Sequence, residues 1–77
     1  MLGKIDAQGQ PPIIVDARGL RCPWPILRLA SAARRGGDRF DLLADDPATA
    51  SELAAYASEQ GWQVAPIDGG FRVTLIR

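Results

Sequence analysis

Short apolar runs alternate with two amphipathic segments along this chain, and that order restricts the possible folds more than any other feature. The first run, Ile13-Ile14-Val15, is β-branched throughout and ends at Asp16, which predicts a short buried strand. Similar strand-like runs cover residues 39–44, 62–67 and 71–76. One amphipathic segment lies between the first two runs and the other between the second and third. The predicted order is therefore strand, helix, strand, helix, strand, strand.

Both amphipathic segments are predicted to be helices because each carries apolar residues at helical spacing and ends at glycine. The first stripe is Ile26, Leu29, Ala30 and Ala33, and the second is Ala50, Leu53, Ala54 and Ala57. Gly36-Gly37 stops the first helix, residues 26–35, and Gly61 stops the second. Asp46 is expected to be the N-cap of the second helix, with Pro47 in its first position.

The last two strands form a predicted hairpin, because Asp68-Gly69-Gly70 is a strong turn signal. Pro66 cannot donate to a strand ladder, so the third strand should end or lie at an edge there. Right-handed crossovers would put both helices on one face of a four-stranded mixed sheet. The predicted fold class is α/β, a two-layer βαβαββ sandwich. With 77 residues the chain has room for one domain, expected at residues 13–77 after a flexible N-terminal arm, residues 1–12.

The chain has one cysteine and no histidine, which excludes an internal disulfide and any Cys-His or Ser-His nucleophile pair. Nine basic residues balance nine acidic ones, so the charge does not favour nonspecific binding to nucleic acid. No apolar run is long enough for a membrane helix, and the N-terminus does not have the pattern of a signal peptide. A reducing cytoplasm is the expected location.

Cys22 lies at the entrance of the first predicted helix, followed by Pro23 and Pro25. Proline suits the first turn of a helix, where its missing N–H would have no partner within the helix. The positive end of the helix dipole and the nearby Arg18 and Arg21 would favour the thiolate, so the pKa of Cys22 is expected to be lowered and its sulfur exposed. The alternative is that Cys22 is a small buried apolar residue.

Residues 16–25, Asp-Ala-Arg-Gly-Leu-Arg-Cys-Pro-Trp-Pro, resemble the Asp-x-x-Gly-Leu-x-Cys-Pro-x-Pro signature of the TusA/SirA-like sulfur-carrier family. The resemblance implies the same βαβαββ sandwich, with a persulfide on Cys22 accepted from a cysteine desulfurase or rhodanese-type donor. Cys22 would then pass the sulfur to an acceptor protein in tRNA thiolation, molybdenum cofactor assembly or sulfur oxidation. The chain would be a monomeric sulfurtransferase component rather than a free-standing enzyme, with no metal and no cofactor beyond the covalent sulfur.

Other residues around Cys22 are candidates for supporting roles, some through the resemblance and some through their own chemistry. Asp16, Gly19 and Leu20 belong to the motif and are expected to organise its loop. Trp24 stands where the tRNA-thiolation prototype has an acidic residue, and it is either an exposed partner anchor or part of the core. Asp45 and Asp46 match an acidic pair of the family, as a strand end and helix cap or as a docking site. The basic face of the first helix, Arg28, Arg34 and Arg35, is solvated or steers an acidic partner.

Two other functions remain open from the sequence. One is a non-enzymatic interaction or regulatory module in which Cys22 is a redox-sensing thiol. The other is nucleic-acid binding, which the balanced charge disfavours.

Overall fold

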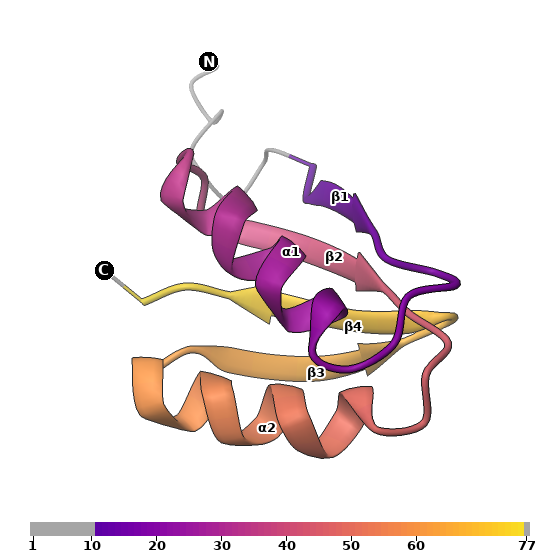
Figure 1. Cartoon of the computed structure of the whole chain (residues 1–77). Coiled ribbons are helices and arrows are strands. Elements are labelled where there is room, and N and C mark those ends of the chain that lie inside the picture. The colour runs from indigo at the N-terminus through magenta and orange to yellow at the C-terminus, as the bar shows by residue number, and fades with distance from the viewer. Residues whose placement is uncertain (1–10, 77) are drawn as a thin grey trace.

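The computed structural model describes residues 11–76 and contains the predicted order of elements (Figure 1). The strands are β1 (Ile13–Asp16), β2 (Arg39–Leu43), β3 (Gln63–Ile67) and β4 (Gly70–Thr74), and the helices are α1 (Trp24–Arg34) and α2 (Thr49–Gln60). Of the predicted N-terminal arm, residues 1–10 lie outside the described residues. Within the described part, neither helix is long and apolar enough to span a membrane.

The four strands form one mixed sheet in the order β1-β2-β4-β3, with the two helices over one of its faces (Figure 1). β1 runs parallel to β2, and β4 runs antiparallel to both of its neighbours, β2 and β3. The prediction of a two-layer α/β sandwich is confirmed. β3 is an edge strand, as expected for the strand that contains Pro66.

The core lies between the helices and the covered face of the sheet. Its buried apolar side chains are Val15, Phe40, Leu42 and Val73 from the strands, Ile26, Leu29, Ala30 and Ala33 from α1, Leu53 and Ala57 from α2, and Ala17 and Leu75 just after β1 and β4. The whole predicted stripe of α1 is therefore buried. Burying each of the larger apolar side chains contributes about 1.5–3 kcal/mol to folding. Trp62 adds an edge-to-face contact with Tyr56, at a centroid distance of 5.4 Å, where α2 leads into β3.

The prediction that the first strand is buried is wrong for two of its three apolar residues. Val15 is buried, but Ile13 is 46% exposed and Ile14 is 59% exposed. Two features explain this: β1 has a described neighbour, β2, on one side only, and Ile14 alternates with the buried Val15, which puts it on the face that the helices do not cover.

The second helix begins later than predicted, at Thr49, and its N-cap is Ala48 rather than Asp46. The buried side of the helix also differs from the predicted stripe. Thr49, Leu53 and Ala57 are buried, whereas Ala50 and Ala54 of the predicted stripe are exposed. The predicted stop is confirmed, because Gly61 adopts a left-handed conformation at the C-cap with φ of 77°.

Candidate functional site

Two loops meet at the end of the sheet where the parallel strands β1 and β2 finish (Figure 1). The first, residues 17–23, carries Cys22, and the second, residues 44–48, connects β2 to α2. The Ala17 N–H donates to the Leu43 carbonyl over 2.7 Å, which continues the strand pairing into the loops. The two loops are therefore held together by their backbones before any side chain contributes.

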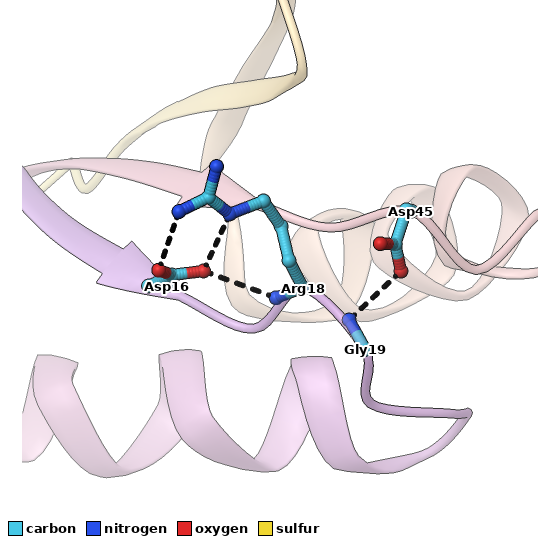
Figure 2. A network of polar contacts seen from close by, with 4 residues as sticks. All are labelled: Asp16, Arg18, Gly19 and Asp45. Carbon is cyan, nitrogen blue, oxygen red and sulfur yellow. Dashed lines mark hydrogen bonds and ion pairs between the residues drawn. The ribbon is translucent and has the colours of Figure 1, made fainter.

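The acidic pair of the second loop binds backbone donors of the first. The Gly19 N–H donates to Asp45 Oδ1 over 2.9 Å (Figure 2), and the Cys22 N–H donates to Asp46 Oδ2 over 2.6 Å. Gly19 has φ of 83°, a conformation that favours glycine and aims its N–H across the gap. Asp45 and Asp46 thus bind the backbone of the cysteine loop. The sequence had suggested a strand end and helix cap, or a docking site, and did not predict this contact between distant segments.

Asp46 also organises the approach to α2. Its Oδ1 accepts a hydrogen bond from the Ala48 N–H over 3.1 Å, and its backbone carbonyl accepts one from the Thr49 N–H. The backbone N–H groups of Cys22 and Ala48 lower the pKa of Asp46, in that order of importance. The expectation that Asp46 is the helix N-cap is wrong because this carboxylate is shared between the turn before α2 and the cysteine loop.

Asp16 and Arg18 form a second local network at the start of the cysteine loop (Figure 2). The Arg18 guanidinium donates to both carboxylate oxygens of Asp16, at 2.9 and 2.8 Å, and the Arg18 backbone N–H adds a third bond at 3.1 Å. These bonds lower the pKa of Asp16 to about 2. The motif aspartate therefore stabilises the turn that leads to Gly19, as the sequence suggested for a loop-organising residue.

The start of α1 contains both prolines next to Cys22. Pro23 is the N-cap residue, the Cys22–Pro23 peptide bond is cis, and Pro25 is a buried residue of the first turn. The Trp24 N–H donates to the Arg21 carbonyl over 2.7 Å. The Trp24 N–H is therefore already bonded, and Pro25 has no N–H. Neither residue offers a free donor to an anion at the start of α1.

Cys22 is partly buried and borders a hollow of about 520 Å³ between the two loops. Other residues that line this hollow are Gly19, Leu20, Arg21, Asp45, Asp46 and Pro47. Burial raises the pKa of the Cys22 thiol, a hydrogen bond with the Glu52 carboxylate raises it further, and the charges of Glu52 and Asp46 act in the same direction. The predicted lowering of this pKa is wrong for the free protein, in which the thiol is held protonated.

The arginines expected to favour the thiolate act on carboxylates instead. Arg18 pairs with Asp16, and the charge of Arg21 contributes to the lowered pKa of Asp46. Together with the few free donors at the start of α1, these pairings explain why position at a helix entrance does not lower the pKa of Cys22.

Glu52 is the site residue that the sequence interpretation missed. It lies in the first turn of α2, is exposed, and accepts the hydrogen bond of the thiol. The sequence signal was a carboxylate at the start of the second helix, but only the packing of the two loops brings that turn to Cys22.

The exposed side of α1 begins with apolar residues next to Cys22. Trp24 is 59% exposed and Leu27 is 47% exposed, and Arg28 is exposed one position further along. Trp24 is therefore exposed, and the alternative that it forms part of the core is wrong. Leu20, by contrast, packs against the core and anchors the loop.

Comparison with protein-family models gives a match over most of this chain. The model described as "Sulfurtransferase TusA" matches residues 13–77, a segment that includes every helix and strand of the structure and both loops around Cys22.

Proposed function

The chain belongs to the TusA sulfurtransferase family, whose members carry sulfur in relays between proteins, and from that premise we propose that Cys22 is the residue that holds the sulfur as a persulfide. The observation that carries the proposal is the place of Cys22, the chain's one cysteine, beside an open hollow where two loops meet. A carrier needs its sulfur at a surface that donor and acceptor can reach in turn.

Transfer requires no change in overall oxidation state. The Cys22 sulfur attacks the outer sulfur of a donor protein's persulfide, and the sulfur–sulfur bond of the donor breaks. The donor leaves as a thiolate and takes up the proton that Cys22 released, so that one thiol and one persulfide are present before and after the step. Delivery to an acceptor thiol is the same exchange in the opposite direction. The donor is a cysteine desulfurase or a rhodanese-type protein, and the acceptor is a thiol protein of a sulfur relay.

Because Cys22 has acidic surroundings, we expect the rate of sulfur exchange to depend on the charges that the partner brings. In the free protein the thiol is protonated beside Glu52 and Asp46, and a protonated thiol is a poor nucleophile. A donor whose docking surface places a positive charge against Glu52 removes a cause of the raised pKa and releases the thiolate where it is needed. The same protonation disfavours the redox-sensor alternative, because oxidation of a sensor thiol follows its thiolate character.

The experiment is loading with sulfur in a purified system. The protein is incubated with a cysteine desulfurase and cysteine, and its intact mass is measured before and after reduction. We expect the addition of one sulfur atom that reductant removes, and no addition to Cys22→Ser, whose fold is checked by circular dichroism. Equal addition to Cys22→Ser, or none to the wild type, contradicts the proposal.

A further inference from the structure

A second hollow, of about 630 Å³, lies between the outer edge of β1 and the exposed side of α1, and we call it the β1 groove. The residues used below are Ile13, Ile14, Arg28, Ser31, Ala32 and Arg35, all of which line it. None of the residues that line this hollow also lines the hollow beside Cys22. The β1 groove is therefore separate from the site of sulfur transfer.

One wall of the β1 groove is the outer edge of β1. Among the described residues β1 pairs with β2 alone, so its other edge presents backbone N–H and C=O groups without a strand partner. Proteins usually protect such an edge with lysine, proline or a bulge. Here the edge carries the exposed apolar side chains of Ile13 and Ile14, which favour pairing with a further strand.

The opposite wall is positively charged. Arg28 and Arg35 are two turns apart along α1 and its C-cap, on the same side of the helix, which places them about 10 Å apart. Within the part of the chain that the structure describes, neither guanidinium has a hydrogen bond or ion pair. Asp16 also lines the groove, and the charge of Arg28 contributes to its lowered pKa, but its carboxylate is paired with Arg18, and α1 contains no acidic residue.

We propose that the β1 groove binds an extended segment of a partner protein that pairs with the edge of β1 and carries acidic side chains on both sides of an apolar one. Side chains two or four residues apart share a face of a strand and are about 7 or 13 Å apart, distances that two flexible arginines can match. The apolar side chain between them would contact Ala32 and Ile13, and the acidic ones would pair with Arg28 and Arg35. Binding here leaves Cys22 open to solvent.

The probe is a synthetic peptide, Thr-Glu-Thr-Val-Thr-Glu-Thr, titrated into the isotope-labelled full chain carrying Cys22→Ser, so that the result does not depend on sulfur chemistry. We expect amide chemical shift changes in β1 and along the outer side of α1, and weaker binding at higher salt. Replacing both Glu of the peptide by Gln, or making Arg28→Glu or Arg35→Glu, should weaken binding about tenfold. Arg34→Glu is the matched control, because Arg34 is an exposed arginine of α1 outside the groove, and it should bind as the parent does.

Pairing with the strand edge is tested by two N-methylated peptides, each with methyl groups on alternate residues. Only alternate N–H groups of an added strand face β1. Methyl groups on those residues should abolish binding of the peptide, and methyl groups on the other residues should leave binding unchanged. Equal binding of both, shift changes confined to the Cys22 loop, or no loss with Arg28→Glu and Arg35→Glu overturns the proposal. Self-association in sedimentation equilibrium that Ile14→Lys abolishes would assign the edge to a second copy of the chain and would also overturn it.

Discussion

The backbone N–H of Cys22 donates a 2.6 Å hydrogen bond to the carboxylate of Asp46, which lies in the loop before α2. The same carboxylate accepts the Ala48 N–H, so one side chain holds both the backbone of Cys22 and the approach to the helix that presents Glu52. Asp46 therefore links the backbone of Cys22 directly to the segment that leads into α2, in addition to the contacts of Ala17 and Gly19 with the second loop.

Asp46→Ala is expected to loosen the cysteine loop while the sheet stays folded. Arg18 and Arg21 lie in that loop, and trypsin cleaves after arginine in mobile segments. Cleavage after these two residues should become several times faster, as measured by mass spectrometry of the fragments over time. Asp68→Ala, in the exposed turn between β3 and β4, is the matched control and should leave those two rates unchanged. Unchanged cleavage in Asp46→Ala would show that the carboxylate does not hold the loop.

Glu52→Gln is expected to make Cys22 more reactive. The substitution removes a charge that raises the pKa of the thiol and weakens the hydrogen-bond acceptor that favours the protonated form, so the pKa of Cys22 should fall. The alkylation rate with iodoacetamide at pH 8 should rise several-fold, and its pH profile should move to lower pH. Glu59→Gln removes a carboxylate near the other end of α2 and should react like the wild type. A slower reaction in Glu52→Gln would show that the carboxylate activates the thiol instead.

The order of strands and helices could be predicted from the sequence because apolar periodicity and glycine stops are local signals. The burial of β1 could not, because it depends on strand order. Ile13 and Ile14 have the composition of a central strand, but among the described strands β1 has a neighbour on one side only, β2. The late start of α2 had the same kind of cause, since Asp46 caps no helix when its carboxylate bonds to Cys22.

The candidate site shows a similar division. The cysteine, its prolines and the exposure of its loop follow from neighbouring residues in the sequence. The direction of the Cys22 pKa shift does not, because burial of the thiol raises this pKa most and Glu52 and Asp46 raise it further, and all three arise only when the two loops pack together. The N–H groups at the start of α1 alone do not predict the pKa of Cys22, because the carboxylates of Glu52 and Asp46 also act on the thiol.

Acid is expected to destabilise the fold below about pH 5. The pKa of Asp16 is lowered from 3.8 to about 2, and hydrogen bonds also lower the pKa values of Asp41 and Asp46. The unfolded chain therefore binds more protons in acid than the folded one, so the stability that these carboxylates contribute is fully present above about pH 5 and is lost progressively towards pH 2. The urea midpoint should fall across this range, and Asp16→Asn should flatten part of the dependence. A midpoint that rises between pH 5 and pH 3 would contradict this assignment.

Leu53→Ala is expected to be strongly destabilising. Leu53 is fully buried between α2 and the sheet, and truncating a buried leucine costs about 2–5 kcal/mol. In a domain of this size that loss corresponds to a decrease in Tm of at least about 10 °C. Leu27→Ala, on the exposed side of α1, should change the free energy of unfolding by no more than about 0.5 kcal/mol. Equal effects of the two substitutions would be inconsistent with the core described above.

Trp24→Ala is expected to separate partner binding from stability. The indole is mostly exposed beside Cys22, so its removal should leave the urea midpoint and the alkylation rate of Cys22 close to those of the wild type. An exposed aromatic next to a reactive atom is well placed to anchor a docking protein, and truncation of such an anchor commonly weakens binding by tenfold or more, about 1.4 kcal/mol. Sulfur loading by a limiting concentration of the donor enzyme should therefore slow about tenfold and recover when the donor concentration is raised. Leu27→Ala is the matched control for a smaller exposed apolar residue of α1, with a smaller expected effect. Loading of Trp24→Ala at the wild-type rate at every donor concentration would exclude this residue from the docking surface of that donor.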